Sequence, residues 1–222
     1  MSKSHDATLL ERMTFFSDAV FAIAITLLVI EVRVPEIHGA TDAALGQALI
    51  ALIPKYVGFV VSFFVIGRFW LGHHRLFGLL RSTDDRLTYA NILLLLGIAF
   101  TPFPTAVFSE YVNLKTATFL YTGWLIVLGL LNMRLVHVAL REPLLDPAHD
   151  PVLADHLRHG TWLPIMIGLA ASLAAFAGPL VVLLVLLVGP VLGAFVLHRI
   201  RRPALGEADA SAGMPLEPSG QL

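Results

Sequence analysis

The chain has 222 residues, of which 57% are apolar and 14% charged, with a mean hydropathy of +0.79 and a formal net charge of −1. An average soluble domain has about 45–50% apolar and about 25% charged residues, so this chain has more apolar surface than one soluble core can bury. An ordinary cytosolic enzyme, a nucleic-acid-binding protein and a disordered regulator are therefore excluded. The absence of cysteine from the sequence excludes a disulfide scaffold and a thiolate metal site. The remaining class is a polytopic membrane protein.

Six apolar segments are long enough for membrane spans, because about 20 helical residues cross the ~30 Å hydrocarbon layer. The predicted spans cover residues 13–34, 56–77, 87–107, 117–140 and the two halves of 162–197. Pro35 stops the first span, and Pro102 and Pro104 interrupt the third. The stretch 162–197 contains no charged residue and would form a helix of about 54 Å, which is too long for one crossing. We therefore expect a turn at Gly178-Pro179, and the sequence predicts an all-α membrane protein with six transmembrane helices.

Lysine and arginine are distributed unevenly between the predicted loops, and this bias indicates how a membrane protein is oriented. With a cytosolic N-terminus, the inner side holds Lys3, Arg12, Arg75, Arg81, Arg86, Arg134, Arg141, Arg158, Arg199, Arg201 and Arg202, and the outer side holds Arg33, Lys55 and Lys115. Both termini are therefore expected in the cytosol. Residues 1–202 are predicted to form one transmembrane domain, and the Gly-, Pro-, Ser- and acid-rich residues 203–222 a disordered cytosolic tail.

The cytosolic end of the first span carries the pattern R-x-x-x-F-S-D, whose specified residues are Arg12, Phe16, Ser17 and Asp18. A tryptophan and two histidines lie at a comparable depth in the second span, at Trp70, His73 and His74. Polar and ionised side chains are costly in a membrane, so they pair with one another or mark a functional pathway. We expect the Asp18 carboxylate to meet an imidazole or an indole N–H as a structural clamp between helices. A proton relay or an ion site is the alternative.

The first span also has an aliphatic stripe. Ile23, Leu27 and Ile30 recur at i, i+4 and i+7, and Thr26 lies on the flank of this stripe. Asp18 is about 140° around the helix from the stripe, so the clamp and the stripe are expected to face different neighbours. Taken alone, such a stripe is more typical of lipid or helix packing than of a pore.

The two motifs together resemble the prokaryotic branch of the transmembrane protein 175 potassium channel family. They are R-x-x-x-F-S-D followed by A-V-F-A-I-A-I-T-L-L, and F-W-L-G-H-H-R-L-F at residues 69–77. The resemblance implies a homotetramer in a prokaryotic plasma membrane, with a potassium-permeable pore lined by the first helix. By the same resemblance, Ile23, Leu27 and Ile30 correspond to the family's aliphatic narrowing and Thr26 to a threonine layer.

The expected pore differs from a carbonyl filter, because the chain contains no T-V-G-Y-G sequence. A ring of isoleucines offers no oxygen ligands, so a permeating ion sheds part of its hydration shell. Potassium holds its water less tightly than sodium, so we expect a modest preference for K⁺ over Na⁺, with closure by dewetting. Glu31 and Glu36 either attract cations to the outer mouth or are solvated loop charges. Besides permeant K⁺ no cofactor is expected, and no nucleophile–base arrangement indicates an enzyme.

Two other functions are compatible with the residues alone. A proton-conducting or proton-coupled transporter would use Asp18 with His73 or His74, whereas a membrane scaffold would carry no ions. The loop after the fourth span is rich in metal-ligating residue types, at Asp146, His149, Asp150, Asp155, His156 and His159. Their loose spacing favours a solvated loop over a metal site. Arg68, within the second span, is expected to reach the interface or an acidic group.

Overall fold

A computed structural model describes residues 2–39, 41–190 and 192 of the chain. The described residues are helical and contain no strand. The helices are α1 (Ser2–Leu27), the 3₁₀ turn η1 (Leu28–Glu31), α2 (Asp42–Ala51), α3 (Ile53–Phe77), α4 (Asp85–Phe100), α5 (Pro102–Glu110), α6 (Lys115–Ala139), α7 (Pro151–Gly160), α8 (Trp162–Ala174) and a further apolar helix at Pro179–Pro190. The predicted tail at 203–222 lies outside the described residues.

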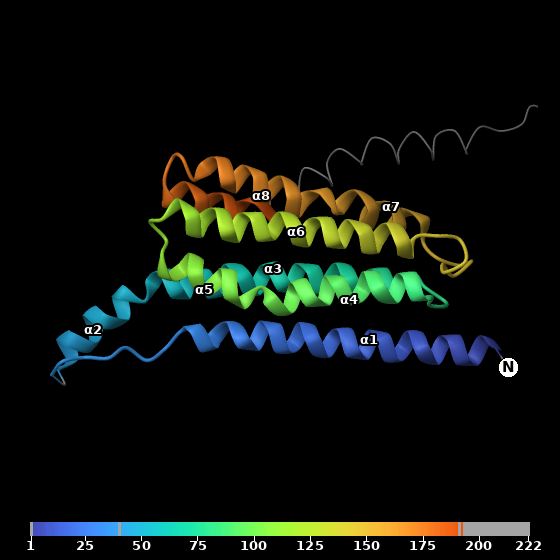
Figure 1. The fold of residues 1–222 in the computed structure, drawn as a ribbon, viewed down its shortest axis with the longest axis horizontal. Coiled ribbons are helices and arrows are strands. Elements are labelled where there is room, and N and C mark those ends of the chain that lie inside the picture. The colour runs from blue at the N-terminus through green and yellow to red at the C-terminus, as the bar shows by residue number, and fades with distance from the viewer. Residues whose placement is uncertain (1, 40, 191, 193–222) are drawn as a thin grey trace, which may run out of the picture.

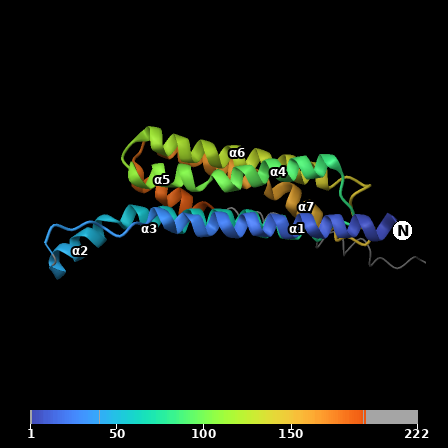
Figure 2. The same cartoon turned by 60° about the horizontal axis from the view of Figure 1, so that its bottom comes forward.

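The helices form an elongated bundle in three layers. Figure 1 shows α1 along one side, α3, α4 and α5 in the middle, and α6, α7 and α8 on the other side. Helix α1 packs on both α3 and α4, and Figure 2 shows it running beside α3 along most of its length. The N-terminus lies at the same end of the bundle as α7, and α2 lies at the opposite end (Figures 1 and 2).

Four helices are long and apolar enough to cross a membrane, namely Asp6–Glu31, Ile53–Phe77, Asp85–Glu110 and Lys115–Ala139. These correspond to the first four predicted spans. Helix α8 and the described part of the last helix are shorter than a full crossing. Six spans per subunit therefore stay a prediction.

The first helix has different boundaries from those predicted. It begins at Ser2 instead of residue 13, because the polar residues ahead of the apolar core include no helix breaker. Its α-helical part ends at Leu27 and continues as the 3₁₀ turn to Glu31, instead of reaching Val34. The polar start of α1 thus extends the helix by several turns beyond the apolar segment.

The proline interruption of the third span is present as a break at Thr101 between α4 and α5. Pro102 has no backbone N–H, so the preceding turn loses a hydrogen-bond donor. The Thr101 hydroxyl donates to the carbonyl of Gly97 (2.9 Å) and the Thr105 hydroxyl to that of Thr101 (2.9 Å). These side chains supply donors to backbone carbonyls beside the break, as an apolar environment requires.

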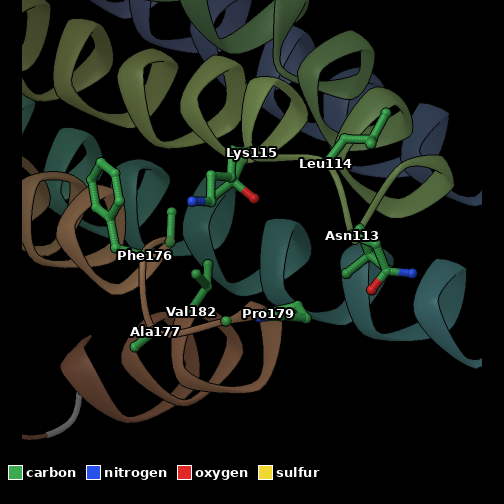
Figure 3. Close-up of a pocket in the computed structure, with 11 residues that line it drawn as sticks. Asn113, Leu114, Lys115, Phe176, Ala177, Pro179 and Val182 are labelled. Atoms are coloured by element: carbon green, nitrogen blue, oxygen red, sulfur yellow. The ribbon is translucent and has the colours of Figure 1, made fainter.

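The predicted turn at Gly178-Pro179 is confirmed. Gly178 has a φ of +121°, a backbone conformation that residues with a side chain rarely adopt. Gly189 lies beside Ile167, and a Cβ at Gly189 would be 3.3 Å from the Ile167 Cγ1. Since these two residues are equally far from Gly178 along the chain, α8 and the last helix form an antiparallel hairpin. At the turn, the Lys115 ammonium lies 4.9 Å from the centre of the Phe176 ring (Figure 3).

Helices α6 and α8 approach closely through glycine. A Cβ at Gly168 would lie 2.7 Å from the Ile126 Cγ1 and 3.0 Å from the Thr122 backbone oxygen, so α8 has no room for a side chain there. The Thr122 and Ser172 hydroxyls are 2.7 Å apart across the same interface. Small residues at such contacts let helix backbones pack tightly in a membrane.

Gly168→Val should therefore lower the free energy of unfolding by about 1–3 kcal/mol, because the added side chain forces α6 and α8 apart. Gly123→Val on α6 is the matched control, since a Cβ at Gly123 meets no atom within 4 Å. Thermal unfolding in detergent measures both variants. An equal loss of stability in the two variants would mean that the helix propensity of valine, and not the close contact at Gly168, causes the destabilisation.

Candidate ion-conducting face and polar network

Helix α1 has one face against the bundle and one open face. Among the four long helices its apolar window is the least buried, at 22% against 33–50% for the others. The covered face carries Ser17, Phe21, Ala24 and Leu28, all buried. The predicted aliphatic stripe lies on the open face, where Ile23 is 58%, Leu27 40% and Ile30 60% exposed. The stripe is therefore free to meet another copy of the chain, lipid or a water-filled path.

The stripe continues through the change of helix type at Leu28. Ile30 lies in the 3₁₀ turn and not in the α-helix. Side chains three residues apart eclipse in a 3₁₀ helix, so Ile30 stays in line with Leu27. Thr26 is exposed on the same side, and its hydroxyl donates to the backbone oxygen of Ile23 at 2.9 Å. Its oxygen lone pairs remain available to a cation or to water.

Asp18 is joined to the second long helix by a hydrogen bond, as expected. The Trp70 indole Nε1 donates to the Asp18 Oδ1 at 2.9 Å, and the indole stacks on the His74 ring with centroids 5.6 Å apart. The partner of Asp18 is therefore the indole and not an imidazole. Asp18 is half-buried and Trp70 is 38% exposed, so this contact lies at the edge of the helix interface.

His73 belongs to a second, fully buried network. The Asn91 amide nitrogen on α4 donates to the Ser17 hydroxyl on α1 (2.9 Å), and its Oδ1 lies 2.9 Å from the Nε2 of His73 on α3. Ser17 in turn donates to the carbonyl of Met13 (2.8 Å). Since Asn91 Oδ1 only accepts, His73 Nε2 carries the proton. One asparagine thus ties α1, α3 and α4 together.

The remaining nitrogen of His73, Nδ1, is buried and has no hydrogen-bond partner among the described residues. The ring stacks on Phe77 with centroids 4.0 Å apart and lies 5.4 Å from Phe21. The two networks are separate in their hydrogen bonds, because Asp18 bonds Trp70 whereas His73 bonds Asn91.

The other predicted site residues lie apart from these networks. Arg12 is exposed near the N-terminal end of α1, and Phe16 is 58% exposed on its open face. Glu31 is half-buried and Glu36 exposed, and both belong to the segment between α1 and α2, which lies at the end of the bundle away from the N-terminus (Figure 1). No group of three metal-ligating side chains occurs in the part of the chain that the structure describes. In the acidic and histidine-rich loop, Asp150 instead caps α7 by accepting the backbone N–H of Val152 at 2.8 Å.

Sequence reasoning missed Asn91, the residue at the centre of the buried network. Its signal was a lone carboxamide in the otherwise apolar segment N-I-L-L-L-L, which in a membrane indicates a polar partner. A buried hydroxyl cluster was also missed, in which Ser62 lies 2.8 Å from Thr105 and 2.9 Å from Tyr121. Both groups hold helices together inside one subunit.

Asp18→Ala should lower the free energy of unfolding by about 1–3 kcal/mol, because the Trp70 indole N–H loses its acceptor. Trp70→Phe should cost a similar amount, and the double variant little more than either single one. Thermal unfolding and oligomer yield in detergent measure all three. If Asp18→Ala assembles normally but loses ion preference, Asp18 belongs to the permeation path and not to a helix contact.

Comparisons with known proteins agree with this architecture. The family described as endosomal/lysosomal potassium channel TMEM175 matches residues 12–102. A potassium channel of Chamaesiphon minutus is 41% identical over 143 residues, which are 63% of this chain and 70% of that protein. The crystal structure of a lysosomal potassium-selective channel TMEM175 homolog from the same organism matches with a TM-score of 0.73 and 32% identity, covering 85% of this chain and 97% of that one. The chain belongs to the TMEM175 family.

Other proteins similar to this chain carry two kinds of name. A potassium channel of Streptomyces collinus is 44% identical over 102 residues, about half of either chain (46% and 48%). The human endosomal/lysosomal proton channel TMEM175 is 28% identical over 155 residues, which are 66% of this chain and 30% of that protein. The resemblance drawn from the sequence is confirmed. The chain is a multi-pass membrane protein of an ion-channel family and not an enzyme.

Proposed function

We propose that this chain forms a potassium-permeable channel in which four copies surround a central axis with α1 facing inward. The observation that carries the proposal is the open aliphatic face of α1, on a helix whose other face is tied to α3 and α4 by polar contacts. The solved relative, described as a potassium-selective channel, supports it because this chain covers 97% of that structure.

A single copy does not enclose a conduction path, because only one helix presents the stripe and its open face has no wall opposite. Four copies related by a cyclic axis would place four stripes around one path. The hydrogen bonds from Trp70 and Asn91 would then fix the rotation of α1 about its own axis. The register of the stripe against the pore axis would depend on these contacts.

Rings of Ile23, Leu27 and Ile30 would form the narrow part of this pore. Aliphatic rings offer no ligands, so selectivity would come from the cost of removing water, which is lower for K⁺ than for Na⁺. The same rings would close the pore when water leaves them. Thr26 would add a ring of hydroxyl oxygens, and Glu31 and Glu36 would raise the cation concentration at the mouth.

The proposed location is the plasma membrane of a prokaryote. The end of the bundle that carries the N-terminus, α7 and most of the lysine and arginine would face the cytosol. Glu31 and Glu36 would then lie on the outer side. The C-terminus, which follows the described residues, would also be cytosolic.

Proton permeation is the second candidate function, and the names of the animal relatives as proton channels favour it. Asp18 with His73 or His74 would be the titrating groups. Asp18 and His73 make separate hydrogen bonds, so a direct proton step between them would need a rearrangement or water. A reversal potential that follows the proton gradient and not the potassium gradient would favour this function.

The test of the proposed function is cation flux from proteoliposomes containing the purified protein. K⁺ flux should exceed Na⁺ flux under matched gradients, and the protein in mild detergent should have the mass of a tetramer. Absence of any flux would favour a scaffold. A homogeneous monomer or dimer that still conducts would contradict the central pore.

A further inference from the structure

Arg68 on α3 is exposed and has no partner among the residues that the structure describes. It makes no hydrogen bond with any described residue, and no described carboxylate lies within 4.0 Å of its guanidinium. Arg68 lies nine residues before Phe77, the last residue of α3, which places it about 13 Å from that end of the helix. An ionised side chain at this depth in a membrane is costly unless it is paired or reaches the interface.

A second polar side chain without a partner lies at the same place. Arg68 lines a cavity of about 70 Å³ between α3, α6 and the α7–α8 region, together with Asn132 of α6 and His156 of α7. Asn132 makes no hydrogen bond with a described residue, although it lies on a membrane-spanning helix. His156 has its Nδ1 at 2.9 Å from the Val152 carbonyl, which leaves Nε2 for other partners. Three polar side chains from three helices therefore meet at one cavity.

The cavity has room for a group larger than water. Gly72 and Gly160 both line it, and a Cβ at either position would meet no atom within 4 Å. Arg68, Gly72 and Arg75 follow one another at i, i+4 and i+7, so the two arginines lie on one face of α3 with the half-buried Gly72 between them. This face of α3 leads from Arg68 towards the end of the bundle that carries the N-terminus (Figure 1).

The hydrogen-bond donors that line the cavity indicate which kind of molecule binds there. Arginine offers planar N–H donors that suit paired oxygens, and the Asn132 amide adds two further donors. No acidic side chain occurs among the described residues that line the cavity, which favours an anion with several oxygens. Phe69, Leu163 and Pro164 make the remaining wall apolar, which favours an anion attached to a hydrocarbon body over a free ion.

We propose that this cavity binds the phosphodiester headgroup of a phospholipid from the leaflet nearer the N-terminus, with Arg68 and Asn132 as its main ligands. The site is distinct from the open face of α1, and its occupancy does not depend on whether the chain conducts potassium. A bound phosphate supplies the counter-charge that Arg68 lacks among the described residues. It also bridges α3, α6 and α7.

Native mass spectrometry of the purified, full-length assembly tests the site with phosphatidylglycerol in detergent. Arg68→Gln should weaken lipid binding about tenfold, because it removes a charge-assisted, bidentate contact between the guanidinium and two phosphate oxygens. Asn132→Leu should weaken lipid binding by a smaller factor. Arg134→Gln is the matched control, since it removes an exposed arginine near the same end of α6 without touching the cavity. Lipid binding by Arg134→Gln should stay within about twofold of that of the wild type.

The thermal midpoint gives an independent readout. Phosphatidylglycerol should raise the midpoint of the wild type and of Arg134→Gln, and should not raise that of Arg68→Gln. Stabilisation by inorganic phosphate equal to that by the lipid would replace the proposal with a free-anion site. Equal losses in Arg68→Gln and Arg134→Gln would overturn it in favour of general surface charge. Loss of the oligomer in Arg68→Gln, with lipid binding unchanged, would assign Arg68 to a carboxylate of a neighbouring copy.

Discussion

Ile23→Ser is expected to lower the K⁺/Na⁺ permeability ratio by roughly fivefold, equivalent to about 1 kcal/mol, and to raise the total current. Ile23 is 58% exposed on the open face of α1 and begins the aliphatic stripe. In the proposed pore, a ring of serines would be wider and would offer hydroxyl oxygens, so sodium would cross with more of its water in place. The barrier to wetting would fall at the same ring. Bi-ionic reversal potentials measure the ratio.

Ile92→Ser on α4 is the matched control, because Ile92 is a similarly exposed isoleucine (49%) on another membrane-spanning helix. The K⁺/Na⁺ permeability ratio of this variant should stay within about 1.5-fold of the wild-type ratio if only α1 lines the pore. The buried side of α1 offers no such control, since Ile25 packs against the core. A large change for Ile92→Ser with an unchanged ratio for Ile23→Ser would place the pore on a different helix.

Asn91→Leu is expected to lower the free energy of unfolding by about 2–4 kcal/mol, the largest stability loss predicted for this chain. The substitution removes two buried hydrogen bonds at once, one to Ser17 and one to His73. His73 is 1% exposed and its other nitrogen is already unbonded, so the imidazole would have no partner. Thermal unfolding in detergent measures the loss, with the exposed loop variant Asn113→Leu as the control.

A compensating variant separates the lost hydrogen bonds from a packing defect. His73→Phe combined with Asn91→Leu should recover most of the stability, because replacing both partners by apolar groups leaves nothing unsatisfied. Phe21 and Phe77 already surround the imidazole with aromatic rings. A double variant as unstable as the sum of the two single ones would show that packing, and not polar satisfaction, holds this site together.

The sequence predicts the long helices and the final turn well, because membrane spans require long apolar segments and breaks require glycine or proline. The turn at Gly178 and the break beside Pro102 lie where these residues occur. The start of α1 at Ser2 was missed, since hydropathy marks where a helix enters an apolar environment and not where its hydrogen bonding begins.

The hydrogen-bond partner of each polar residue was harder to predict than the positions of the polar residues. Composition and depth indicate that Asp18 needs a donor from α3, and both Trp70 and His73 satisfy that requirement. Helix rotation decides between them, and a single sequence does not specify it. The role of Asn91 depends on α4 packing against both α1 and α3, a three-helix arrangement that no local pattern encodes. The close approach at Gly168 depends on tertiary packing in the same way.

The most direct test of the central claim uses the absence of cysteine from this chain. Ile30→Cys introduces a single thiol per chain in η1, where the 3₁₀ turn continues the open face of α1. A positively charged, water-soluble thiol reagent should modify it in proteoliposomes and abolish most of the potassium current, because four modified side chains would crowd one narrow path. Ile92→Cys should conduct unchanged after the same treatment. An unaltered current in modified Ile30→Cys, with block in Ile92→Cys, would contradict a pore lined by α1.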